Sequence, residues 1–196
     1  MIYHIVKRSF DICVSLIALP FLAVLYIGVG VAIKLEDGGP VFYIAERIGK
    51  DSKLLKMYKF RSMKVNAPNI VNLDGSTYNS PNDLRLTRVG KFIRETSIDE
   101  VPQILNVLKG EMSLIGPRAS EWDVIDSFKD DEIDKMKVLP GITGYTQAYF
   151  RNGLSPREKR LKDAWYANNA SLWLDIKIFF KTIQTVLKRE NIYTNE

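Results

Sequence analysis

The longest apolar segment of the chain lies near its N-terminus, where residues 12–33 (ICVSLIALPFLAVLYIGVGVAI) contain no charged side chain. As a straight α-helix this segment would extend for about 33 Å, which is enough to cross a hydrocarbon core about 30 Å thick. It is too long for a removed signal peptide and lacks a small-residue cleavage site, and the charged boundary at 34–37 leads directly into a folded type of sequence. We therefore expect a membrane anchor that stays attached to the protein.

Two topologies are compatible with this anchor. Pro20 lies near its middle, where it removes a backbone hydrogen bond and bends a helix. Lys7 and Arg8 precede the segment and Lys34 follows it, so the positive-inside bias does not separate its two ends. A hairpin that breaks at Pro20 and returns to the cytoplasmic face places both positively charged flanks on the cytoplasmic side. A kinked single span is the alternative, and the residues alone favour it because spanning helices tolerate proline.

Beyond the anchor, short β-prone segments and turns predict a small β-hairpin. Residues 41–44 and 54–60 favour strands, and the sequence GKDS at 49–52 can form the turn between them. The second strand ends in Lys59 and Arg61, which either lie on a solvated strand edge or face a phosphate. Residues 64–83 are rich in Asn, Pro, Gly, Ser and Thr and are expected to form an irregular loop.

Helical periodicity dominates the remainder of the chain. Apolar residues at helical spacing from Ile98 to Leu108 predict a helix that stops at Gly110. Ser155 and Glu158 form a capping-box pattern with Pro156 at the first helical position, which predicts a further helix start. The last helix has one broad apolar face: Leu172, Ile176, Phe179, Phe180, Ile183 and Leu187. This face fits either an interfacial helix with snorkelling lysines or an ordinary helix that faces the core.

Composition limits the chemistry that this chain can perform. With 196 residues and 46% hydrophobic content, the chain is long enough for one domain with its own core. It has one cysteine, Cys13, and one histidine, His4, which excludes an internal disulfide and makes a histidine triad or a multi-histidine metal site untenable. The net charge of +5 suits phosphorylated ligands, anionic lipids or nucleic acid.

The candidate chemistry lies in the stretch TSIDEVPQ, where two carboxylates, Asp99 and Glu100, stand side by side. Ser97 and Glu100 also match a capping box, which would make the pair a simple helix start. With Ser97 as the N-cap, Pro102 falls in the second turn, where it is costly; with Asp99 as the N-cap it costs little. The register of this helix start stays open.

The chain resembles the bacterial sugar transferases, or monotopic phosphoglycosyl transferases of the small catalytic-domain type, nearly from end to end. The motifs that carry the resemblance are KRSFD, GGPVFY with ERIGK, YKFRSM, RLTRVGKFIRETSIDEVPQILNVLKGEMSLIGPR, PGITGYTQ, RNGLS and NNASLWLDIKI. Members of this family move a phospho-sugar from a UDP-sugar to polyprenyl phosphate and release UMP. The resemblance therefore implies a transferase that acts in glycoconjugate and polysaccharide biosynthesis.

Site residues follow from the matching positions. Asp99 corresponds to the family's nucleophile and Glu100 to its dyad partner, with both as ligands of Mg²⁺. Substrate-binding charged residues are implied at five further positions: Lys59, Arg94, Arg118, Arg151 and Asp163. Some positions depart from the family pattern without touching the dyad: Leu19, where serine commonly precedes the proline, Ala45, Ala119 in place of the second proline of GPRP, and Phe150.

The resemblance also replaces the preference for a span, because the family's N-terminal segment is re-entrant. We expect a mixed α/β protein with a re-entrant membrane helix broken at proline (residues 1–36) and a compact, mainly helical cytosolic domain (37–196) with a small β-hairpin and interfacial amphipathic helices. It is expected to be monotopic, on the cytoplasmic face of the bacterial inner membrane. The implied partners are a UDP-sugar, polyprenyl phosphate and membrane lipid, but no nucleic acid; a homo-oligomer and downstream glycosyltransferases are further candidates.

Elementary chemistry explains why this reaction suits adjacent carboxylates. A carboxylate that attacks the anionic β-phosphate needs a cation to screen its approach and arginines to hold the oxygens. Neighbours on a helix point about 100° apart, so one can face phosphorus while the other holds metal. A ping-pong route through a covalent aspartyl phospho-sugar follows. Two alternatives remain: a membrane-anchored metal-dependent hydrolase of lipid pyrophosphates and a non-catalytic membrane scaffold.

Overall fold

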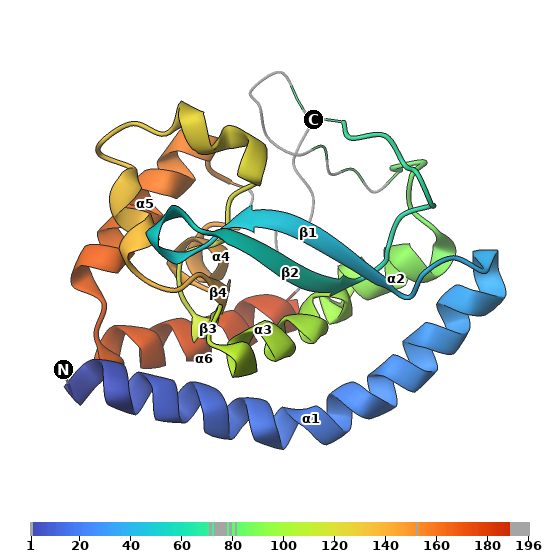
Figure 1. The fold of residues 1–196 in the computed structure, drawn as a ribbon, viewed down its shortest axis with the longest axis horizontal. Coiled ribbons are helices and arrows are strands. Elements are labelled where there is room, and N and C mark those ends of the chain that lie inside the picture. The colour runs from blue at the N-terminus through green and yellow to red at the C-terminus, as the bar shows by residue number, and fades with distance from the viewer. Residues whose placement is uncertain are drawn as a thin grey trace.

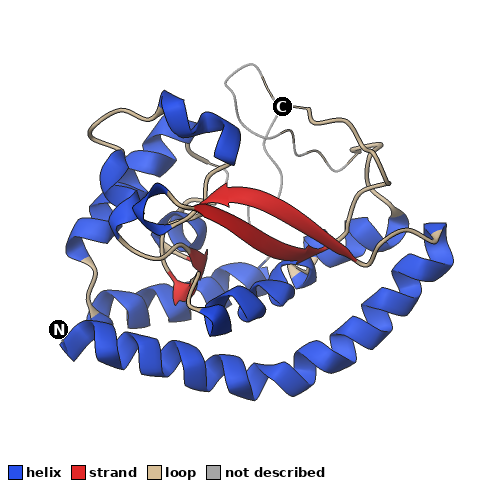
Figure 2. Cartoon of the chain, in the orientation of Figure 1, coloured by secondary structure: helices blue, strands red, loops and turns tan. Residues whose placement is uncertain are grey.

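The computed structural model describes residues 2–70, 72, 78, 80, 82–151 and 153–188. Its longest element is helix α1 (Ile2–Asp37), which runs along one side of a domain of shorter helices and small sheets (Figure 1). Figure 2 shows that helices make up most of the described chain. The predicted mixed class, with a long apolar N-terminal helix and a small hairpin, is therefore confirmed.

The other elements follow in chain order. They are β1 (Phe42–Ile48), β2 (Leu54–Phe60), α2 (Arg88–Glu95), α3 (Ile104–Lys109), β3 (Ser113–Ile115), β4 (Gly141–Thr143), α4 (Tyr145–Tyr149), α5 (Pro156–Asn169) and α6 (Leu172–Lys188). Short 3₁₀ segments lie between them: η1 (Lys50–Ser52), η2 (Ile98–Gln103), η3 (Trp122–Ser127) and η4 (Ile133–Lys137).

Helix α1 is long and apolar enough to cross a membrane, and only 17% of its most apolar stretch is buried by the domain. It continues through Pro20 as a single helix, so the predicted division at this proline is not confirmed. Figure 1 instead shows a bowed helix, which is the bending that an internal proline favours. A narrow face packs on the domain: Asp11, Ser15, Leu22, Gly30 and Ile33.

Polar contacts attach the N-terminal part of α1 to the domain. Lys7 forms an ion pair of 2.7 Å with Asp175 in α6. Arg8 donates to the carbonyl oxygens of Val107 and Leu108, in the last turn of α3, at 2.7 and 3.2 Å. The Val107 carbonyl also accepts from the N–H of Gly110, and a guanidinium is well placed to satisfy the remaining acceptor capacity at this helix end.

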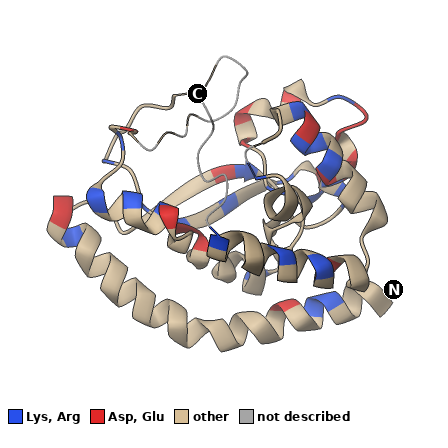
Figure 3. Cartoon of the chain, turned by 180° about the vertical axis from the view of Figure 1, so that it is seen from behind, with Lys and Arg blue, Asp and Glu red and all other residues tan. Residues whose placement is uncertain are grey.

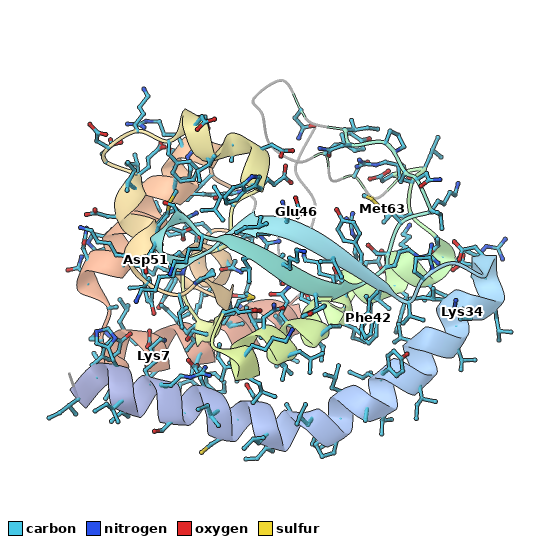
Figure 4. The ribbon with its side chains drawn as sticks, in the orientation of Figure 1. Lys7, Lys34, Phe42, Glu46, Asp51 and Met63 are labelled. Carbon is cyan, nitrogen blue, oxygen red and sulfur yellow. The ribbon has the colours of Figure 1, made fainter. Side chains whose placement is uncertain are left out.

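The C-terminal end of α1 is attached to the same domain. Glu36 accepts hydrogen bonds from the backbone N–H groups of Arg88 and Val89, at the start of α2. Asp37 forms a bidentate pair with Arg61, directly after β2. Arg61 therefore faces the anchor rather than a phosphate. Figure 3 shows that the charges on α1 lie near its two ends, and Figure 4 shows Lys7 and Lys34 near those ends.

The predicted hairpin forms, and its first strand is longer than expected. Strands β1 and β2 pair antiparallel from Phe42 opposite Phe60 to Ile48 opposite Leu54. A second sheet, the parallel pair β3 and β4, has no counterpart in the sequence prediction. Its strands have three residues each and continue into a close backbone contact, since a Cβ atom at Gly116 would lie 2.4 Å from the carbonyl oxygen of Leu139.

The core consists of three clusters of buried apolar side chains. One joins the hairpin to α3 (Ala45, Leu55, Met57, Val107, Met112), one joins α1, the hairpin and α2 (Leu22, Ile33, Phe60, Ile93), and one lies among α4, α5 and α6 (Ile115, Ala148, Tyr166, Ile178).

Helix ends and helix faces can be compared directly with the prediction. The capping box at Ser155 is present in full, with Pro156 at the first helical position, and Gly110 ends α3 with a left-handed φ of 83°.

In α6, the side chains of Asp175, Ile178 and Thr185 are buried. All six residues of the predicted apolar face are exposed instead: Leu172, Ile176, Phe179, Phe180, Ile183 and Leu187. An exposed apolar face favours the interfacial interpretation of α6 over the core-facing one.

Candidate active site

The two adjacent carboxylates lie in η2, the 3₁₀ segment between α2 and α3 that packs against strand β2. Asp99 is 8% exposed, and the side chain of Glu100 is 20% exposed. No hydrogen bond to the carboxylate of Asp99 is found among the described residues, so its oxygens are not committed to another group. The pair is thus held in a partly enclosed position with one carboxylate available for chemistry.

The capping-box interpretation of this stretch is wrong. Ser97 has a left-handed backbone, with φ of 58°, and its side chain makes no capping hydrogen bond. Residues that cap through a side chain normally have an extended backbone, which Ser97 lacks. The turn at Ser97 redirects the chain from α2 into η2, and the proline falls inside the 3₁₀ segment, where it is buried. The carboxylates are therefore not accounted for as a helix cap.

Two cationic side chains contact Glu100 of the dyad, and a third acts on Asp99 through its charge. Lys59, from β2, places its ammonium 2.9 Å from Oε1 of Glu100. Arg118, from the turn after β3, places Nη2 3.2 Å from the same oxygen. Arg94, in the last turn of α2, is close enough that its charge lowers the pKa of Asp99. This arrangement gathers positive charge around two carboxylates, as a site for a polyanionic ligand requires.

The surroundings of the two carboxylates shift their pKa values in opposite directions. Burial raises the pKa of Asp99 to about 6, helped by the negative charge of Glu100 and opposed by Lys59. Burial also acts on Glu100, but the charges of Lys59 and Arg118 outweigh it and lower the pKa of Glu100 to about 2. Glu100 is therefore the firmly ionised, ion-paired member, and Asp99 is the more weakly stabilised carboxylate. Different pKa values for two adjacent acids are a common property of catalytic pairs.

The strand and helix beneath the dyad are joined by a buried amide. Asn106, in α3, is fully buried; its Oδ1 accepts from the backbone N–H of Tyr58, and its Nδ2 donates to the carbonyl of Lys56. These bonds fix α3 against β2, next to Lys59. The sequence pattern did not single out Asn106, because an asparagine at one helical position carries no local signal of its partners.

Of the other two predicted site residues, Asp163 lies outside the dyad. Asp163 is 1% exposed and does not contact the dyad; it accepts a hydrogen bond of 2.8 Å from Thr146 and forms an ion pair of 3.2 Å with Lys135. Arg151 follows α4 with a left-handed φ of 45° and is half-buried. The structure thus brings Lys59 and Arg118 into contact with the dyad, with Arg94 near enough to act on Asp99 by its charge, and places Asp163 behind the turn that carries Arg118.

The predicted metal can be tested against the donor groups that are present. Among the described residues, no group of three or more His, Cys, Asp or Glu side chains could hold a metal ion. Mg²⁺ commonly uses only one or two protein carboxylates together with phosphate oxygens and water. The dyad therefore fits Mg²⁺ when a phosphate-containing substrate supplies the other oxygen ligands, and does not fit a dedicated structural metal site.

A family model described as "Bacterial sugar transferase" matches residues 2–189. Among curated relatives, a UDP-N-acetylgalactosamine-undecaprenyl-phosphate N-acetylgalactosaminephosphotransferase of Aeromonas hydrophila is 43% identical over 95% of this chain and 44% of its own length. An undecaprenyl-phosphate galactose phosphotransferase of Salmonella typhimurium is 40% identical over 95% of this chain and 41% of its length. The chain thus spans less than half of these relatives. A sugar transferase named EpsL, of Bacillus subtilis, is 38% identical over 96% of this chain and 90% of its length.

Proposed function

Because this chain belongs to the bacterial sugar transferase family, we propose that it moves a phospho-sugar from a UDP-sugar to polyprenyl phosphate, with release of UMP, as the first membrane step of glycoconjugate assembly. The names of the Aeromonas and Salmonella relatives describe transfers of this kind to undecaprenyl phosphate. The observation that carries the proposal is the partly enclosed Asp99–Glu100 dyad with Lys59, Arg94 and Arg118 around it.

The first half of the reaction uses Asp99 as a nucleophile. One carboxylate oxygen attacks the β-phosphorus of the UDP-sugar, the bond from this phosphorus to the bridging oxygen breaks, and UMP leaves with that oxygen. An aspartyl phospho-sugar remains on the protein. The absence of hydrogen bonds to Asp99 among the described residues supports this role, because its lone pairs are free to attack.

The second half releases the sugar. An oxygen of polyprenyl phosphate attacks the same phosphorus, and the carboxylate of Asp99 leaves unchanged, so that polyprenyl-diphosphate-sugar is formed. Arg118 and Lys59 hold phosphate oxygens in both steps by charge-assisted hydrogen bonds. Glu100, which now bridges these two cations, keeps them oriented before substrate binds.

Mg²⁺ is proposed as the cofactor, with Asp99 and Glu100 as the residues that would hold it. When bound, it supplies positive charge that screens the approach of a carboxylate to a diphosphate. The protein itself contributes the two carboxylates, which lie side by side on the short segment η2.

The contacts of α1 with the domain support a monotopic topology. A helix that crosses a bilayer places its ends on opposite sides, whereas the Lys7 and Glu36 ends of α1 both contact the same domain. We therefore propose that residues 1–36 enter and leave the same leaflet, and that residues 37–196 form the catalytic domain at the cytoplasmic face. The exposed apolar face of α6 then lies in the interface.

A panel of UDP-sugars with polyprenyl phosphate and Mg²⁺ tests the function. Purified protein in lipid nanodiscs should release UMP with at least one of UDP-N-acetylgalactosamine, UDP-galactose and UDP-glucose, and form a lipid-linked sugar. EDTA should stop both. Consumption of lipid diphosphate without transfer of sugar would instead identify a hydrolase. If Asp99→Asn left the function of the protein in cells unchanged, only the hypothesis of a non-catalytic membrane scaffold would remain.

A further inference from the structure

The turn that presents Arg118 rests on a buried ammonium group. Lys135, from η4, is 7% exposed, and its Nζ donates to the carbonyl oxygen of Arg118 at 2.9 Å and to Oγ of Ser120 at 3.0 Å. The third partner of this ammonium is the carboxylate of Asp163, in α5, at 3.2 Å. One side chain therefore uses all three of its donors to join the Arg118 turn to the body of the domain.

The counter-ion of Lys135 is itself fixed from a second side. Asp163 accepts a hydrogen bond of 2.8 Å from Thr146 in α4, and only 1% of the residue is exposed. Burial lowers the pKa of Lys135, and the nearby Asp163 counteracts this effect. A charge pair enclosed in this way holds its geometry, because moving either partner leaves the other buried without compensation.

The guanidinium at the other end of this connection is not held by packing. The side chain of Arg118 is 52% exposed, and among the described residues its guanidinium contacts one oxygen of Glu100. The main chain of the turn must therefore fix where the side chain starts. The next residue, Ala119, packs its small side chain against the core cluster that joins the hairpin to α3, and a small pocket lies beside it, lined in part by Pro117, Ser120 and Lys135.

We propose that Lys135, with Asp163 as its counter-ion, is a positioning residue for the proposed transfer reaction: it sets the position of the Arg118 turn and, through it, the grip of Arg118 on the phosphate. This assigns Asp163 a supporting role behind the turn instead of direct contact with substrate. The expected effect of Lys135 on the reaction rate rests on the proposed function, whereas its expected effect on the position of the turn does not.

A matched control exists between the same two elements. Glu132, next to η4, is fully buried and pairs with Arg157 of α5 at 2.6 Å, yet neither residue touches the Arg118 turn. Arg157→Met removes a charge from an ion pair that joins the same parts of the fold. Because Glu132 keeps Arg160 as a partner at 3.0 Å, this variant reports the loss of one ion pair between these parts of the fold without the loss of the contact to Arg118.

The first measurement is amide hydrogen exchange of the peptide that covers residues 115–122, followed in Lys135→Met, Arg157→Met and the unchanged protein. The double variant Lys135→Met, Asp163→Asn leaves no lone buried charge and keeps the measurement available if the single variant does not fold. Faster exchange in the Lys135 variants than in Arg157→Met is expected. Equal exchange in all of them would overturn the proposal, whatever happens to activity.

The second measurement is a double-mutant cycle in kcat for UMP release, with the UDP-sugar from the panel that gives the fastest turnover. Lys135→Met should lower kcat by about tenfold to a hundredfold, as a displaced catalytic group does. In an Arg118→Ala background it should have little further effect, because the group that it positions is gone. Fully additive losses would contradict the proposal. Absence of turnover in the unchanged protein would count against the proposed function, while hydrogen exchange still decides the position of the turn.

Discussion

Asp99 and Glu100 are neighbours with the same chemistry, and their surroundings give them different roles. Glu100 has Lys59 and Arg118 within 3.2 Å of one oxygen, which lowers its pKa to about 2. Asp99 is buried without a hydrogen bond among the described residues, and its pKa rises to about 6. A firmly ionised carboxylate is suited to hold cations in place, and one that is poorly solvated is the better nucleophile.

At the same scale, Arg118 should not be replaceable by lysine. A guanidinium can bind two phosphate oxygens in a fork, whereas an ammonium offers a single point charge. We expect Arg118→Lys to lower kcat/KM by about a hundredfold, the range seen when one oriented donor is lost. The exposed Arg88→Lys serves as the control and should change the rate of UMP release little. A near-normal rate in Arg118→Lys would contradict the phosphate-binding role of Arg118 and leave it only a structural role in the turn.

The residues of the site could be predicted to different degrees. Lys59, Arg94, Arg118 and the dyad lie in continuous motifs, and the structure brings them together. Asp163 also lies in a recognisable stretch, but its partner Lys135 stands in a run of mixed charges with no signal of burial. The backbone of Ser97 was not predictable either, because a serine in the left-handed conformation is imposed by the packing of α2 against η2 rather than by local preference.

Among the elements, α2 depends on contacts from outside its own sequence. Thr87 caps it by accepting from the N–H of Gly90 at 2.8 Å, and Glu36 of α1 binds two further N–H groups of its first turn. A Cβ atom on Gly90 would lie 1.8 Å from the carbonyl oxygen of Ser62. The absence of a side chain there allows the helix to approach the end of the hairpin.

Gly90→Ala therefore separates intrinsic helix preference from packing. Preference alone predicts a gain of up to about 1 kcal/mol, whereas the clash predicts a loss of about 1–3 kcal/mol in the free energy of unfolding. Thermal unfolding in detergent should show the loss. Gly28→Ala in α1, where a Cβ atom meets nothing within 4 Å, is the matched control and should not destabilise. Stabilisation by Gly90→Ala would mean that α2 does not pack on the hairpin as described.

Elements with strong local signals were the ones that the sequence allowed us to predict. The hairpin has β-prone segments around a turn, and α5 begins with a complete capping box. Strands β3 and β4 have three residues each and are paired by the close approach of glycine backbones, so no periodicity marks them. The continuity of α1 through Pro20 agrees with the kinked single helix that the residues alone favoured, because an exposed proline can bend a helix without ending it; the division at this proline was implied only by the resemblance.

At the scale of the whole molecule, the bowed α1 bends toward the domain at both of its ends and contacts it there (Figure 1). Single cysteines at Ile2 and Leu35, which are 74% and 82% exposed, test this arrangement in a Cys13→Ser background. A membrane-impermeant thiol reagent should label neither position in intact spheroplasts and both after lysis. Labelling of one of the two in intact spheroplasts would establish a spanning helix.

The central claim is that Asp99 carries the phospho-sugar between the two substrates, and one mass measurement tests it most directly. Protein incubated with Mg²⁺ and an accepted UDP-sugar, without any lipid, should release about one equivalent of UMP per site and gain the mass of the phospho-sugar on the peptide that contains Asp99. Asp99→Asn should show neither change, because a neutral amide is a poor nucleophile, whereas Glu100→Gln should still allow some adduct. An adduct on Glu100, or a burst of UMP that persists in Asp99→Asn, would contradict the account.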